Sequence, residues 1–100
     1  MGNTDNEKLF SRLIFLSGEN NIEIVIKPLK SKAKGMLVDN TIGLSNKLSV
    51  EEMNYTLAHE LAHYFLHYDK GDTITSEKHA EYEEQADRAA KMLLTALSVQ

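Results

Sequence analysis

The sequence predicts a small α+β domain in which a first helix, a three-stranded antiparallel sheet and two further helices follow one another. Helical spacing of apolar residues near both ends of the chain predicts the helices, and alternation of apolar and polar residues at 22–27 predicts strands. The chain has 100 residues, of which 42% are hydrophobic and 26% charged. These values are typical of one globular domain with a small core, spanning residues 1–100.

The first helix is predicted over residues 4–17. Thr4 and Glu7 have the spacing of a capping box, and Gly18 is the expected stop. Apolar residues follow the cap at helical spacing: Leu9, Phe10, Leu13, Ile14 and Leu16.

Three short strands are expected next. Ile22, Ile24 and Ile26 alternate with polar residues, and Pro28 ends this strand. After a loop at 30–35, residues 36–38 and 41–44 form two strands around a tight turn at Asp39-Asn40.

Two helices complete the chain. Ser49 and Glu52 form a second capping box at the start of one helix, and residues 69–75 form a loop. Ser76 is the expected N-cap of the last helix, which continues to about Ser98.

The most informative segment is His59-Glu60-Leu61-Ala62-His63, an H-E-x-x-H sequence in the first of these two helices. Two histidines four residues apart lie on one helix face, so both imidazoles can bind one Zn²⁺. Zinc lowers the pKa of a bound water towards about 7, and the adjacent Glu60 is placed to accept the proton. The segment therefore predicts two metal ligands and a general base.

The alternative is an ordinary surface helix with two histidines and a solvated glutamate. The flanking residues favour the metal site, because one side of the helix is apolar and the other holds histidines and Glu60 without Lys or Arg. The expected apolar side contains Leu57, Leu61, Tyr64, Phe65 and Tyr68.

A third ligand is expected from the last helix. Glu83 and Asp87 fall on its apolar stripe with Ala86, Ala90, Leu93, Leu94 and Leu97, whereas Glu81 and Glu84 point away. We assign Glu83 to the metal and Asp87 to the free N–H of a ligand histidine. A buried ion pair is the alternative role of this acidic pair, and His79 is the alternative third ligand.

His67 cannot join His59 on one metal, because eight residues separate them by about 12 Å along the helix axis. It is expected beside the cleft. Five side chains are candidates for stabilising the tetrahedral intermediate, and the sequence does not choose among them: Tyr55, Tyr64, His67, His79 and Tyr82.

The segments at 46–49, 56–67 and 83–94 resemble the ImmA/IrrE-type zinc metallopeptidases, over roughly residues 20–95. Gln85 and Ala89 depart from the family pattern, which has an acid and an aromatic residue there. The resemblance implies one Zn²⁺ per chain, a glutamate as third ligand, and cleavage of a helix-turn-helix repressor in a phage, mobile element or stress response. The family pattern often continues beyond the point where this chain ends, in parts that shape the substrate cleft.

Composition and charge limit which other functions the protein can have. A net charge of −4 argues against direct nucleic-acid binding, and the absence of cysteine excludes thiolate zinc sites. Neither a signal peptide nor a long apolar run is visible, so a cytoplasmic location without membrane contact is expected. The alternative function is a zinc-containing antirepressor that sequesters its partner without cleaving it. A closed structural zinc domain would leave Glu60 without a role.

Overall fold

The computed structural model describes residues 2–30, 32–67 and 79–98. The elements are α1 (Gly2–Glu19), β1 (Glu23–Lys27), β2 (Gly35–Val38), β3 (Thr41–Ser45), α2 (Val50–His67) and α3 (His79–Ser98). This α+β order of elements is the predicted one. The expected loop at 69–75, the Ser76 cap and Tyr68 lie outside the described residues.

The sheet is mixed, so the prediction of a wholly antiparallel sheet was wrong. β3 lies in the middle, antiparallel to β2 and parallel to β1. The alternation of side chains defines a face of a strand but not its direction. At the start of β1, the Glu23 N–H donates to the carbonyl of Asn40 (2.9 Å) in the β2–β3 turn, which is consistent with the parallel pairing. The Asn40 side chain in turn donates to the carbonyl of Asn21 (2.9 Å).

The end of α1 differs from the prediction. Gly18 lies within the helix, and the residue with left-handed backbone is Asn21 (φ 59°). Its neighbour Ile22 donates its N–H to the carbonyl of Ser17 (2.9 Å). Asparagine tolerates this conformation better than other non-glycine residues, so it replaces glycine as the stop signal. Thr4 also lies inside α1, which begins at Gly2, so it is not the predicted cap.

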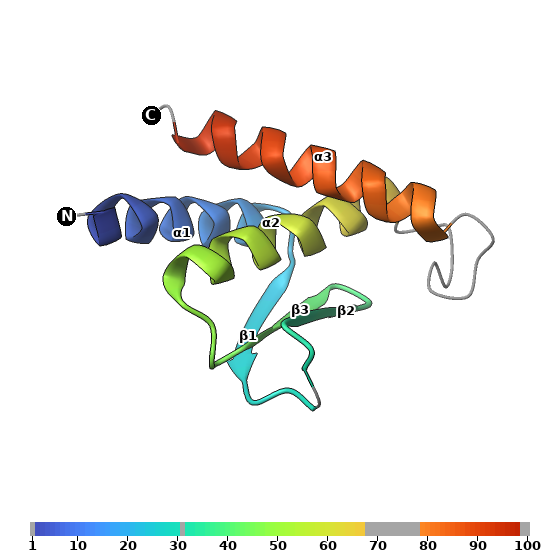
Figure 1. The fold of residues 1–100 in the computed structure, drawn as a ribbon, viewed down its shortest axis with the longest axis horizontal. Coiled ribbons are helices and arrows are strands. Elements are labelled where there is room, and N and C mark those ends of the chain that lie inside the picture. Colours follow the sequence, from blue (N-terminus) through green and yellow to red (C-terminus); the bar gives the residue numbers. More distant parts are fainter. Residues whose placement is uncertain (1, 31, 68–78, 99–100) are drawn as a thin grey trace.

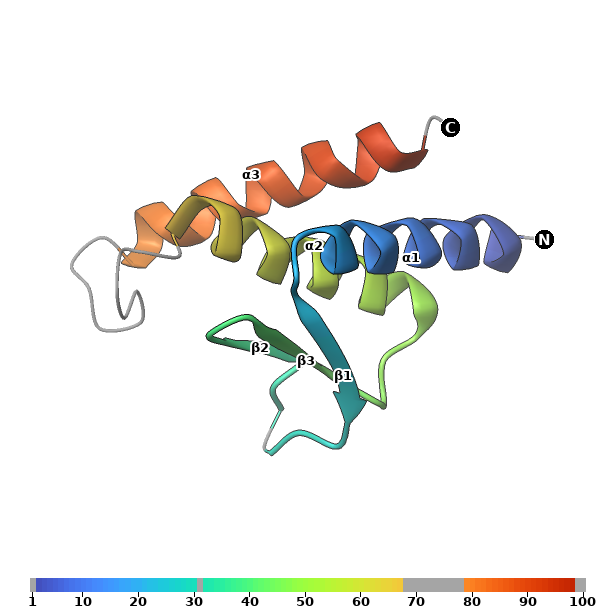
Figure 2. The same ribbon diagram turned by 180° about the vertical axis from the view of Figure 1, so that it is seen from behind.

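The helices form layers on one side of the sheet (Figure 1). α1 and α2 contact the sheet, and α3 packs on α1 and α2; the view from behind shows the same arrangement (Figure 2). The core lies between these layers, where five large side chains are fully buried: Leu13, Ile42, Leu44, Leu57 and Leu61. None of the described helices is long and apolar enough to cross a membrane.

The start of α2 is the capping box that the sequence predicts. The Glu52 N–H donates to Ser49 Oγ (3.2 Å), and the Ser49 N–H donates to Glu52 Oε1 (3.0 Å). Leu57 and Leu61 face the core as expected, but Phe65 is 48% exposed and not part of it. The neighbouring Leu66 is 45% exposed, so the last turn of α2 extends beyond the core.

Close packing of α3 on α2 follows from two small residues. Ala86 and Ala90 are fully buried, while Leu93, Leu94 and Leu97 pack against the core. The distance between packed helices depends on the side chains at the contact, and alanine allows a short one. This approach brings the first turns of α3 to the histidine-bearing face of α2.

Candidate metal centre

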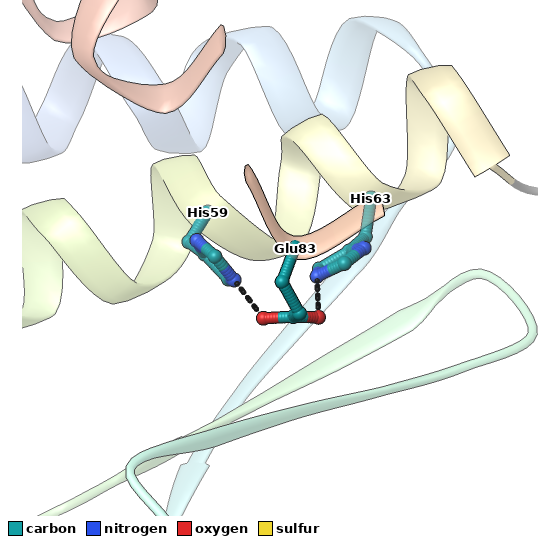
Figure 3. A group of neighbouring side chains, drawn as sticks. All are labelled: His59, His63 and Glu83. Atoms are coloured by element: carbon teal, nitrogen blue, oxygen red, sulfur yellow. Dashed lines mark hydrogen bonds and ion pairs between the residues drawn. The ribbon is translucent and has the colours of Figure 1, made fainter. Parts of the chain in front are cut away.

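Three predicted ligand residues from two helices converge on one point. His59 Nε2 on α2 lies 3.1 Å from Glu83 Oε1 on α3, and His63 Nε2 lies 2.7 Å from Glu83 Oε2. Figure 3 shows the Glu83 carboxylate between the two imidazoles, each of which points a nitrogen at it. The structure thus brings Glu83 to the histidines, as the helical wheel predicts.

The geometry of this group suits a metal ion. Its ligand atoms all lie within 4.8 Å of one another. Two ligands of one tetrahedral zinc lie about 3.3 Å apart, given zinc–ligand distances of about 2.0–2.2 Å. The distances of 3.1 Å and 2.7 Å from the Glu83 oxygens to the two histidines are close to this value. The Glu83 side chain is 41% exposed, and those of His59 and His63 are 20% and 12% exposed. The site is therefore accessible from one side, as a site with an open coordination position must be.

One nitrogen at the site has no hydrogen-bond partner. His59 Nδ1 is buried and unpaired among the described residues. When Nε2 of a neutral imidazole binds a metal, Nδ1 carries the proton and is expected to donate it. Asp87 was expected to accept this proton, but in the structure its carboxylate has other partners. The Asp87 carboxylate instead accepts a hydrogen bond from the Tyr55 hydroxyl and pairs with Lys91 (3.1 Å).

Glu60 lies next to the histidines and lines a cleft of about 460 Å³. The other lining residues are Lys34, Gly35, Glu51, Glu52, Tyr55, Thr56 and His59. Burial, and secondarily the negative charge of Glu83, raises the pKa of Glu60 to about 7. A carboxylate with this pKa is suited to accept and return a proton near neutral pH.

The raised pKa of Glu60 makes the stability of the metal-free protein dependent on pH. The carboxyl binds its proton more tightly in the folded state, at about 7 against an ordinary value of 4.5. Its stabilising effect is complete below pH 4.5 and is lost as the pH rises through 7. The free energy of unfolding should fall by roughly 2–3 kcal/mol between pH 5 and pH 8 on account of this group.

Chemical denaturation in the presence of a chelator measures this loss. Glu60→Gln carries no titrating carboxyl, so its stability should change with pH less than that of the wild type by that amount. An identical decline in both proteins would mean that Glu60 titrates normally.

The other side chains predicted near the cleft are Tyr64, His67, His79 and Tyr82. His79 and Tyr82 lie on the first turn of α3, half-buried, and they are not among its described lining residues. Tyr64 packs against the core, and His67 ends α2 with a side chain that lies outside the description. Tyr55 is the aromatic candidate that lines the cleft, with its ring 5.9 Å from that of His59.

Gly35 at the start of β2 is a residue that the sequence did not single out. A Cβ at this position would lie 2.5 Å from Thr56 Cγ2 and 3.6 Å from Glu60 Cγ. The absence of a side chain therefore allows β2 to pass directly against α2 beside Glu60. A glycine that begins a strand was the available signal, because glycine often marks a close approach of two backbones.

Gly35→Ala is expected to destabilise the protein by roughly 1–3 kcal/mol, as overpacking in a tight contact does. The matched control is Gly18→Ala in α1, where an added Cβ meets nothing within 4 Å. This change should stabilise the helix by roughly 0.5–1 kcal/mol. Thermal and chemical unfolding measure both effects, and a Gly35→Ala variant as stable as the wild type would refute the close approach.

Comparison with known proteins identifies the family. The family model described as the IrrE N-terminal-like domain, which represents a peptidase family, matches residues 18–97. The chain belongs to this family. The match to the IrrE N-terminal-like domain includes β1 to β3, α2 and nearly all of α3, and therefore Glu60 and the three converging residues. No curated protein and no solved structure matches the chain significantly.

Proposed function

We propose that this chain is a zinc-dependent endopeptidase that cleaves a helix-turn-helix transcriptional repressor and so triggers derepression. The observation that carries the proposal is the convergence of His59, His63 and Glu83, with His59 and Glu60 lining the adjacent cleft. Membership of a peptidase family supports hydrolysis of a peptide bond as the reaction.

Zinc is the metal that these ligands favour. Two imidazole nitrogens and a carboxylate oxygen form the ligand set of well-characterised catalytic zinc sites, and one zinc per chain would be held. Structural zinc sites are closed by four protein ligands. Within the ranges that the structure describes, the group contains three residues, which supports a site with room for substrate.

Different residues of the chain would carry out the separate parts of this hydrolysis. Zinc, when bound, supplies a Lewis acid for the substrate carbonyl and the attacking water. Glu60 accepts a proton from that water and passes it to the amine that leaves. In the metal-free protein, burial raises the pKa of Glu60 to about 7, which marks its carboxyl as a group that can hold a proton. His59, His63 and Glu83 would hold the metal.

The sheet offers an edge strand beside these groups to which a peptide substrate could bind. β2 is an outer strand of the sheet and pairs with β3 on one side. An extended peptide can add to such an edge through main-chain hydrogen bonds. Gly35 at the start of β2 lines the same cleft as His59 and Glu60. A segment paired along β2 would therefore pass close to the proposed general base.

The repressor substrate rests on the resemblance to ImmA/IrrE-type enzymes. A chromosomal repressor acts in the cytoplasm, so the proposed reaction belongs there, and recognition of the repressor requires no direct contact with nucleic acid. The net charge of −4 agrees with this.

The test combines purified zinc-loaded protein with the helix-turn-helix repressor encoded beside it. Mass spectrometry should show two repressor fragments with one defined junction, and a chelator should prevent their formation. A repressor that stays full-length but co-elutes with this protein would instead establish the sequestering antirepressor. An intact repressor that does not bind would exclude both functions for that partner.

A further inference from the structure

The contacts between α2 and α3 form a regular series. Tyr55, His59 and His63 are spaced by four residues along one stripe of α2, and Glu83 and Asp87 have the same spacing on α3. Tyr55 contacts Asp87, and both histidines contact Glu83. The early residue of α2 thus meets the later residue of α3, so the two helices run antiparallel. The Tyr55–Asp87 contact lies one helical turn from the candidate metal centre.

We propose that Tyr55 and Asp87 are a positioning pair for the metal centre, in which Asp87 acts through the Tyr55 hydroxyl and not through a ligand histidine. The hydrogen bond ties α3 to α2 one turn from Glu83 and holds the Glu83 carboxylate opposite the two histidines. This role rests on the proposed metal site but does not depend on peptide cleavage.

The surroundings of Asp87 support this assignment. One carboxylate oxygen accepts from the Tyr55 hydroxyl, and the other pairs with Lys91, one turn further along α3. Both oxygens are therefore held, and hydrogen bonds to an ionised acceptor are stronger than neutral ones. On α3, Ala86 is fully buried between Glu83 and Asp87, so the helix is packed closely at this point.

Tyr55 connects this contact to the histidines. Its ring lies 5.9 Å from the ring of His59 at an interplanar angle of 32°, and both residues line the cleft. The hydroxyl is held by α3 while the ring lies beside a ligand imidazole. Loss of the hydroxyl would therefore free the ring and the α3 contact at once, without creating a cavity in the core.

The test measures zinc affinity by competition with a chromophoric chelator, and the absorption spectrum of the cobalt-substituted protein. Tyr55→Phe removes one oxygen and is expected to weaken zinc binding by about 10-fold, within the 10–100-fold range for residues that support ligands. Asp87→Ala should weaken it by a similar factor. The double variant should be no weaker than either single variant, because both changes break the same contact.

Conservative and remote changes separate positioning from general stability. Asp87→Asn keeps an oxygen that accepts from Tyr55, so it should retain most of the affinity. Glu84→Gln alters an exposed ion pair with Arg88 elsewhere on α3 and should bind zinc and cobalt like the wild type. Circular dichroism of the metal-free proteins verifies that each variant is folded.

Wild-type affinity in Tyr55→Phe together with a loss in Asp87→Ala would overturn the proposal, because Asp87 would then act without Tyr55. Wild-type affinity in both variants would overturn it as well. A wild-type protein that fails to bind zinc would refute the metal site itself, and this role with it. Failure of repressor cleavage by a protein that binds zinc would count against the proposed function alone.

Discussion

Glu60→Gln is expected to slow cleavage of the repressor strongly while the fold and the bound metal remain. The amide conserves the shape of the side chain but cannot accept the proton of the attacking water. Loss of a general base lowers rates by about 10²–10⁴-fold. The rate at which repressor fragments appear gives the effect on chemistry, and elemental analysis of the same sample gives the metal content.

Glu84→Gln is the matched control for this prediction. It makes the same chemical change at an exposed position on α3, where Glu84 pairs with Arg88 (2.6 Å), and it should cleave at the wild-type rate. Normal derepression by Glu60→Gln with a full-length repressor would establish sequestration instead of cleavage. Loss of metal in Glu60→Gln would contradict its role as a base that does not bind the ion.

His63→Ala is expected to abolish metal binding. The His63 side chain is 12% exposed and its Nε2 lies 2.7 Å from Glu83, so the residue contributes a ligand from the more enclosed side of the site. Its removal leaves one imidazole and one carboxylate, which are too few protein ligands for a catalytic zinc. Elemental analysis of protein purified without added metal should fall from about one zinc per chain to background.

Glu83→Ala should lose the metal in the same way, whereas Glu84→Ala and His79→Ala should keep it. Full occupancy in Glu83→Ala, with loss in Glu84→Ala or His79→Ala, would show that the third ligand was assigned to the wrong residue of α3. Circular dichroism of the metal-free variants distinguishes loss of a ligand from loss of the fold.

Helix geometry explains which features of the site could be predicted. The four-residue spacing of His59 and His63 places them on one face of any helix that contains them. The same rule separates Glu83, on the apolar stripe of α3, from Glu84, whose side chain is 64% exposed. The capping box at Ser49 and Glu52 likewise depends on residues three apart. Such features need only local backbone geometry, so the sequence contains them in full.

The features that the sequence missed depend on how separate elements approach one another. Neither the parallel pairing of β1 with β3 nor the contact of Gly35 with α2 follows from spacing along the chain. Asp87 shows the difference between a predictable position and an unpredictable partner. Its place on the stripe was predictable, but its partner was not, because only the packing of α3 against α2 puts Tyr55 within reach of its carboxylate. Periodicity thus determined which faces carry the chemistry, whereas the distances between elements, which arise from tertiary packing, decided which side chains meet.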